Sequence, residues 1–162
     1  MGDDFAYLLE ESLQLELNIA DLYLLFEKLF PEDAKFWWQL SLEEKNHGAL
    51  IRSGKEMFLP IGQFPHDFIK DRLQILIDTN SEINSLIRKY QDNGPSREEA
   101  FNIAFDIENS VGELHYQVFM DREAGSKIDD IFQQLNKNDK DHADRIKFYM
   151  QANNISLQSE NL

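Results

Sequence analysis

Two short motifs in this 162-residue sequence pair a carboxylate with an imidazole three residues further along the chain. They are Glu44-Lys-Asn-His47 and Asp139-Lys-Asp-His142. On an α-helix this spacing places both side chains on one face, about one turn apart. A carboxylate beside an imidazole suits iron, manganese or zinc. Because one such pair often lies on a solvated helix face, it is the doubled motif that points to a metal site.

Two further carboxylates interrupt apolar helical stripes. Glu16 and Glu108 each have apolar or small neighbours at helical spacing, which are Leu9, Leu13, Ala20 and Tyr23 for the first and Phe101, Ala104, Phe105, Val111 and Gly112 for the second. An ionised group buried without a partner costs several kcal/mol or more, so such residues are normally paired, neutralised or bound to metal. We therefore expect Glu16 and Glu108 to belong to the same site as the two motifs.

The elements that must position these residues are helices, because no alternating strand pattern occurs anywhere. Prolines, glycines and capping residues divide the chain into helices over about 4–30, 32–57, 66–91 (with a break near 79–81), 96–122 and 126–151. Residues 1–152 are expected to form one all-α domain, a ferritin-like four-helix bundle in which a long helical crossover, 58–95, joins two tight helix pairs. Residues 153–162 are expected to form a flexible tail.

The heights of the candidate ligands in such a bundle agree. In an antiparallel pair, residues equally distant from the turn lie at the same level. The midpoint of Glu16 and Glu44 is position 30, beside Pro31, and the midpoint of Glu108 and His142 is Gly125. At about 1.5 Å per residue each ligand lies roughly 20–26 Å from its turn, so all would share one layer. Four carboxylates and two histidines in one layer form a carboxylate-bridged dinuclear site.

Here the sequence resembles the rubrerythrin branch of the ferritin-like proteins. The first half is similar to their first two helices in Glu16-x-x-x-Ala20-x-x-Tyr23 and Phe36-Trp37-Trp38-x-Leu40-x-x-Glu43-Glu44-x-x-His47. The second half is similar to their last two in Ala104-Phe-Asp-Ile-Glu108-Asn-Ser110 with Tyr116, and in Asp139-x-x-His142-Ala143-Asp-Arg-Ile146. The resemblance covers 5–30, 32–56, 97–122 and 127–150. It implies a non-haem di-iron site, for which Mn or Zn are the other possible metals. The implied ligands are Glu16, Glu44, His47, Glu108, Asp139 and His142. Of these, Glu44 and Asp139 are the candidates for bridging carboxylates.

Three features depart from that family. Asp139 stands where the family usually has Glu, so its carboxylate reaches less far and could bind one ion terminally. Val111 stands where a second Glu is usual, and Glu113 cannot replace it on an α-helix, because five residues rotate by about 500°, which leaves it about 140° from Glu108. A chain without cysteine cannot hold the rubredoxin-like module of many relatives. Peroxidase turnover would therefore need an external electron donor.

Composition excludes several other functions. Zero cysteine rules out disulfides, zinc–thiolate sites and cysteine nucleophiles. The net charge of -14 argues against nucleic acid as a partner and would concentrate cations near the surface. No apolar run approaches the ~20 residues of a membrane span, and the acidic start does not resemble a signal peptide, so a cytoplasmic location is expected. The aromatic-rich helices make a homodimer plausible.

The leading interpretation is a di-iron oxidoreductase that oxidises Fe(II) or reduces O₂ or peroxide. The alternatives are a non-catalytic metal-binding or metal-sensing bundle and an interaction bundle without metal. Tyr23 and Tyr116 are expected to be buried core residues, with a donor or radical role as the alternative. Glu43 is expected to face solvent. Of the Trp37–Trp38 pair, one ring is expected to be buried and the other exposed.

Overall fold

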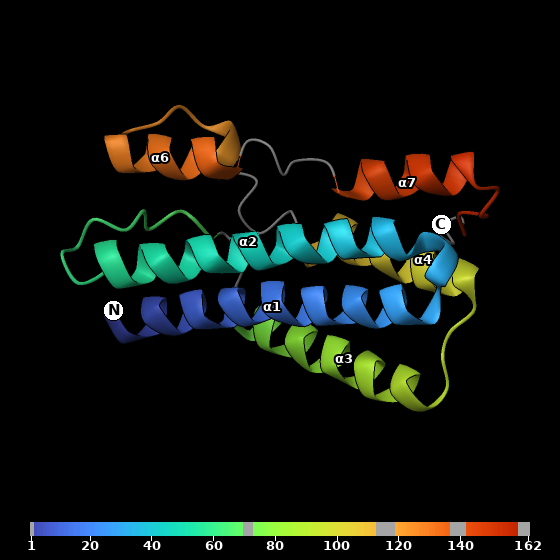
Figure 1. Ribbon diagram of the computed structural model, residues 1–162. Helices are drawn as coiled ribbons and strands as arrows, with labels where there is room; N and C mark the ends of the chain where they lie inside the picture. Colours follow the sequence, from blue (N-terminus) through green and yellow to red (C-terminus); the bar gives the residue numbers. More distant parts are fainter. Residues whose placement is uncertain (1, 70–72, 113–118, 137–141, 159–162) are drawn as a thin grey trace.

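The computed structural model describes residues 2–69, 73–112, 119–136 and 142–158, and within these ranges the secondary structure is entirely helical (Figure 1). The prediction of an all-α chain is therefore confirmed for the described residues. The main elements are α1 (Gly2–Leu29), η1 (Pro31–Asp33), α2 (Ala34–Phe58), α3 (Leu73–Asp92), α4 (Arg97–Ile107), η2 (Glu108–Gly112), α6 (Lys127–Asn136) and α7 (His142–Ala152). None of these helices is long and apolar enough to cross a membrane.

Helices α1 and α2 form a long antiparallel pair (Figure 1). Pro31 opens the connecting turn at a position where its missing N–H costs nothing, and the turn is a short 3₁₀ helix, so α2 begins at Ala34 rather than at the predicted residue 32. A Cβ at Gly48 would lie 3.3 Å from Leu13 and 3.4 Å from Leu17. The small residue thus lets the two backbones approach closely just beyond the Glu44–His47 motif.

The crossover differs from its prediction in where its helix begins and in its continuity. Residues 66–68 form turns and bends, and α3 runs unbroken from Leu73 through the predicted break at 79–81. The polar side chains that suggested a break are accommodated within the helix. The Thr79 hydroxyl donates to the Ile75 carbonyl (2.8 Å), and the Asn80 amide donates to the Glu11 carbonyl (3.0 Å) on α1.

Serine hydroxyls cap two helices in the second half of the chain, near the helix starts predicted at 96 and 126. The Glu99 N–H donates to the Ser96 hydroxyl (3.1 Å) and opens α4, although the Glu99 carboxylate accepts a hydrogen bond from Tyr90. The Asp129 N–H donates to the Ser126 hydroxyl (3.0 Å) and opens α6. The long helices predicted over 96–122 and 126–151 are seen in pieces. The first changes from α to π at Glu108, and the second comprises α6 and α7 on either side of 137–141, which lie outside the described residues.

A partly buried ion pair joins the two halves of the chain at one end of the molecule. Asp33, only 1% exposed, accepts two hydrogen bonds of 2.7 Å from the Arg97 guanidinium and one of 2.8 Å from the Tyr149 hydroxyl. The turn between α1 and α2 is thereby joined to the start of α4 and to α7. This contact helps to set the level at which residues of α2 and α7 face one another.

Aromatic side chains fill the core beside the Asp33–Arg97 ion pair. The Trp37 ring is fully buried, with its centroid 5.6 Å from that of Tyr23, 5.0 Å from that of Phe26 and 4.4 Å from that of Phe101. Trp38 is 51% exposed, so the prediction of one buried and one exposed ring is confirmed. The rings come from α1, α2 and α4, and they form an apolar floor below the buried polar groups described next.

Substituting Gly54 by alanine is expected to destabilise the fold by about 1–3 kcal/mol, the usual cost of overpacking. A Cβ at this position would lie 2.3 Å from Cζ of Phe132 and 2.9 Å from Cε2 of Phe64, both within a packed aromatic cluster. Urea unfolding would measure the change. Gly94→Ala is the matched control, because its Cβ would meet nothing nearer than a Leu29 methyl group at 3.4 Å. Equal stability of the two variants would contradict the packing described here.

Candidate metal centre

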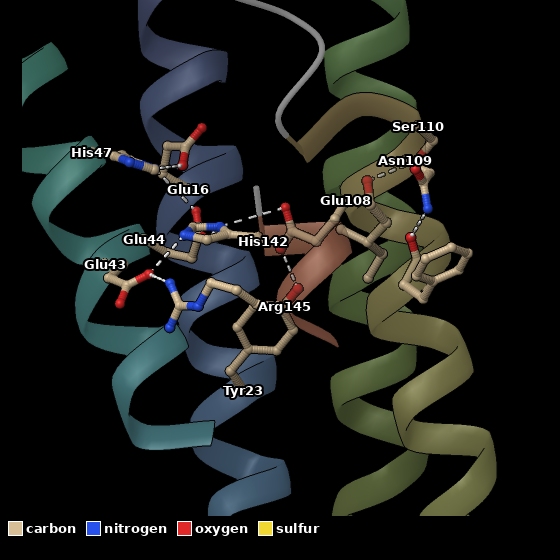
Figure 2. Close-up of polar contacts among 12 residues, drawn as sticks. Glu16, Tyr23, Glu43, Glu44, His47, Glu108, Asn109, Ser110, His142 and Arg145 are labelled. Atoms are coloured by element: carbon tan, nitrogen blue, oxygen red, sulfur yellow. Dashed lines mark hydrogen bonds and ion pairs between the residues drawn. The ribbon is translucent and has the colours of Figure 1, made fainter. Parts of the chain in front are cut away.

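Five of the six predicted ligands converge in the interior (Figure 2). Glu16 projects from the middle of α1, Glu44 and His47 from α2, Glu108 from the first residue of η2, and His142 from the first residue of α7. Each is at most 3% exposed. The side chains come from four separate segments, as the height argument requires. The sixth, Asp139, lies outside the described residues.

The five side chains form two groups that share one member. In the first group His47 Nδ1 lies 3.4 Å from Glu16 Oε2 and 3.4 Å from Glu44 Oε2. In the second group His142 Nδ1 lies 2.6 Å from Glu44 Oε1 and 3.7 Å from Glu108 Oε2. Within each group the three candidate ligand atoms all lie within 4.8 Å of one another.

Glu44 is the shared member, and its two oxygens face different histidines. Its Oε2 atom contacts His47, and its Oε1 atom contacts His142. The two imidazole rings lie 5.6 Å apart, centroid to centroid, and are inclined by only 24°. A carboxylate placed between two donor groups, with one oxygen toward each, has the arrangement needed to bridge two metal ions.

Glu108 occupies a break in the regular helix. Residues Glu108–Gly112 form a π-helix, in which hydrogen bonds span five residues instead of four. The Asn109 amide donates to the Phe105 carbonyl (3.0 Å) and the Ser110 hydroxyl to the Ile107 carbonyl (3.0 Å), so polar side chains support the widened turn. Such segments are frequent at functional sites. The rotation that excluded Glu113 as a replacement ligand assumed an α-helix, which is wrong for this segment, and Glu113 itself lies outside the described residues.

Tyr23 connects the aromatic core to the centre. Its side chain is fully buried, as predicted, and its hydroxyl donates a hydrogen bond to Glu108 Oε1. The predicted core role and the alternative role of a donor to the site are therefore combined in one residue. The bond leaves Glu108 Oε2 facing His142. Tyr116, considered with Tyr23, lies outside the described residues.

Glu43 does not face solvent, and that prediction is wrong. Its Oε2 atom lies 2.8 Å from His142 Nε2 and also accepts a hydrogen bond from Arg145, and the side chain is 22% exposed (Figure 2). Side chains of α7 reach this edge of α2, where His142 and Arg145 contact Glu43 and the Tyr149 ring stacks on Phe36. One sequence feature could have found this contact. Arg145 follows His142 by three residues, so it must lie on the same face of the last helix and offer a cation to α2.

Burial and mutual contacts shift the acid–base behaviour of the centre. Burial, with the charge of Glu44, raises the pKa of Glu16 well above its ordinary value, against the lowering effect of His47. Burial and the charge of Glu44 also raise the pKa of Glu108. Burial alone would raise the pKa of Glu44, but His142 and His47 hold it well below its ordinary value. Of the three glutamates, Glu44 is thus the one whose surroundings favour the ionised form.

The surroundings of His142 favour its protonated form. Burial would lower its pKa, but the charge of Glu44 and the polar contacts with Glu108 and Glu43 raise it well above 6.5. Burial would raise the pKa of Glu43, yet His142 and Arg145 lower it. The raised pKa values of Glu16, Glu108 and His142 favour their protonated forms, whereas a bound cation requires the deprotonated ones, so protons and metal compete for one set of donors.

No family model, curated protein or solved structure matches this chain. The functional interpretation therefore depends on the side chains themselves. Two histidines and three carboxylates, buried together and divided between two groups, can bind divalent cations of intermediate softness, and iron, manganese and zinc fit this donor set.

Proposed function

We propose that this chain is a ferritin-like dinuclear metal protein that binds two iron ions and acts as an oxidoreductase, oxidising Fe(II) or reducing O₂ or peroxide. The observation that carries the proposal is the position of Glu44, whose two oxygens face two different histidines in a fully buried layer. Glu16 and His47 would hold one ion, and Glu108 and His142 the other. Asp139 is proposed as the sixth ligand, on the resemblance alone.

The donors fit such ions in chemistry and in charge. Glu44 Oε1 and Glu108 Oε2 are buried and accept no well-directed hydrogen bond from any described residue. In this structure both atoms face His142 Nδ1, and a cation between them would neutralise the buried carboxylates more completely. The three glutamates can offset three of the four positive charges of two divalent ions, and Asp139 would offset the fourth.

The residues around the donors suit redox chemistry with a small oxidant. Iron would supply one-electron steps and open coordination positions for O₂ or peroxide. Tyr23 holds one oxygen of Glu108 and leaves the other directed inward. The aromatic rings of α1, α2 and α4 exclude bulk water from one side of the centre. Without cysteine the chain supplies no thiolate electron carrier, so peroxide reduction would draw on an external donor.

Protein purified without chelators is expected to contain two iron, manganese or zinc ions per chain, measured by elemental analysis. Apoprotein reloaded with Fe(II) is expected to oxidise it, with consumption of O₂ or peroxide above the rate of free Fe(II). Absence of bound metal, with no uptake on reloading, would overturn the proposal and leave an interaction bundle.

A second candidate is a non-catalytic metal-binding or metal-sensing bundle. It is favoured by the burial of the centre, in which no described donor residue is more than 3% exposed. Binding of two ions without turnover of Fe(II) by O₂ or peroxide would support this candidate over the oxidoreductase.

A further inference from the structure

The two nitrogens of His142 face opposite directions. Nδ1 faces the buried carboxylates of Glu44 and Glu108, and Nε2 lies 2.8 Å from Glu43 Oε2 (Figure 2). The ring itself is fully buried, whereas Glu43 is 22% exposed. The Nδ1 side of the imidazole therefore belongs to the candidate centre. The Nε2 side contacts a carboxylate at the edge of that centre.

Glu43 also connects α2 to a second residue of α7. The Arg145 guanidinium donates to the same Oε2 atom that contacts His142. His142 and Arg145 are three residues apart on one helix face, so a single carboxylate of α2 contacts two neighbouring side chains of α7. The two contacts come from adjacent turns of one helix, so they hold the His142 ring and its helix in one orientation relative to Glu43.

We propose that Glu43, braced by Arg145, is a positioning residue that holds His142 with Nδ1 directed at the metal ions and Nε2–H directed away from them; this rests on the proposed function. A histidine that binds metal must be neutral, and the hydrogen bond made by its other nitrogen decides which nitrogen carries the proton. Glu43 accepts from Nε2, so in the neutral imidazole that binds metal the lone pair lies on Nδ1. Glu43 belongs to neither group of candidate ligand atoms, and its Oε2 atom contacts His142 and Arg145.

Zinc binding by three single variants tests the role of Glu43. Loss of an outer partner of a ligating histidine typically costs about 10–100-fold in metal affinity, and E43A is expected to lose zinc affinity by that factor. E43Q is expected to retain most of the affinity, because an amide oxygen can still accept the Nε2–H bond. E56A, an exposed glutamate distant on the same helix, is the matched control and should bind as the unaltered chain does. Wild-type affinity in E43A would overturn the proposal, as would a loss in E43Q equal to that in E43A.

Nitrogen-15 NMR of the metal-free protein supplies a readout that does not depend on metal binding. The Nε2–H of His142 is expected to exchange slowly with water in the unaltered chain and in E43Q, and to exchange rapidly in E43A. If this pattern holds but zinc does not bind, the contact stands and the proposed metal function fails. If zinc binds and the His142 resonance is the same in E43A, the positioning role fails alone.

Arg145 is tested by a double-mutant cycle. R145A is expected to weaken zinc binding less than E43A does, because Arg145 acts on His142 only through Glu43. In the E43A background the same change should then have no effect. Equal effects in the two backgrounds would show that Arg145 does not act through Glu43, and would overturn that part of the proposal.

Discussion

Replacing Glu44 by glutamine is expected to reduce the binding capacity from two ions per chain to none, whereas Glu16→Gln should remove only one. The difference follows from geometry. Glu44 belongs to both groups of donor atoms, while Glu16 belongs to the group of His47 alone. Zinc titration followed by elemental analysis after desalting would count the ions. Glutamine preserves the shape of the side chain, so circular dichroism should show the same helix content in both variants.

The contrast between the two variants is what tests the shared carboxylate. An equal loss of ions in Glu44→Gln and Glu16→Gln would show that the two groups form one indivisible site, or that Glu44 serves only one of them. Glu108→Gln extends the comparison to the other group. It is expected to retain the ion held by Glu16 and His47, because no oxygen of Glu108 belongs to that group.

The convergence of the site residues could be predicted because helix geometry is regular. Glu16, Glu44 and His47 lie on two long helices joined by a short turn, where a rise of about 1.5 Å per residue fixes the level of each side chain. Pro31 marked that turn correctly. The same regularity explains the buried Trp37 and the exposed Trp38, since adjacent residues point about 100° apart on a helix.

The features that the sequence did not predict are those that depart from this regularity or depend on contacts between helices. The sequence Glu-Asn-Ser-Val-Gly contains no signal that distinguishes a π-helix from a continuing α-helix. The rotation per residue of an α-helix therefore does not apply beyond Glu108. The helical spacing within α2 places Glu43 at the edge of the apolar face and predicts an exposed side chain. Only the contacts with His142 and Arg145 of α7 bury it in part. The polar residues near 79–81 suggested a break, yet Asn80 is satisfied by α1.

Metal binding is expected to strengthen as pH rises, with net release of protons. His142 has a pKa held well above 6.5 by its carboxylate neighbours, and burial raises the pKa values of Glu16 and Glu108. Each of these groups must lose its proton to ligate an ion. Calorimetric titration of zinc in buffers of different ionisation enthalpy would count the protons released. A heat of binding that is the same in every buffer would contradict the prediction.

The same shifts predict that the stability of the metal-free protein and the stabilisation added by metal change in opposite directions with pH. A raised pKa means that the folded state holds its proton more tightly than the unfolded chain does, so this contribution is fully present below the unfolded value and is lost as pH rises through the folded one. For His142 this stabilising contribution begins to be lost above about pH 6.5, and for Glu16 and Glu108 above about pH 4.5. Glu44 has a lowered pKa, so its contribution is lost only as pH falls through its folded value, below 4.5.

From pH 6.5 upward the melting temperature of metal-free protein should therefore fall while the increment added by zinc grows, and His142→Gln should flatten both trends. If the melting temperature changed with pH in the same way with and without zinc over this range, protons and metal would not compete for these side chains.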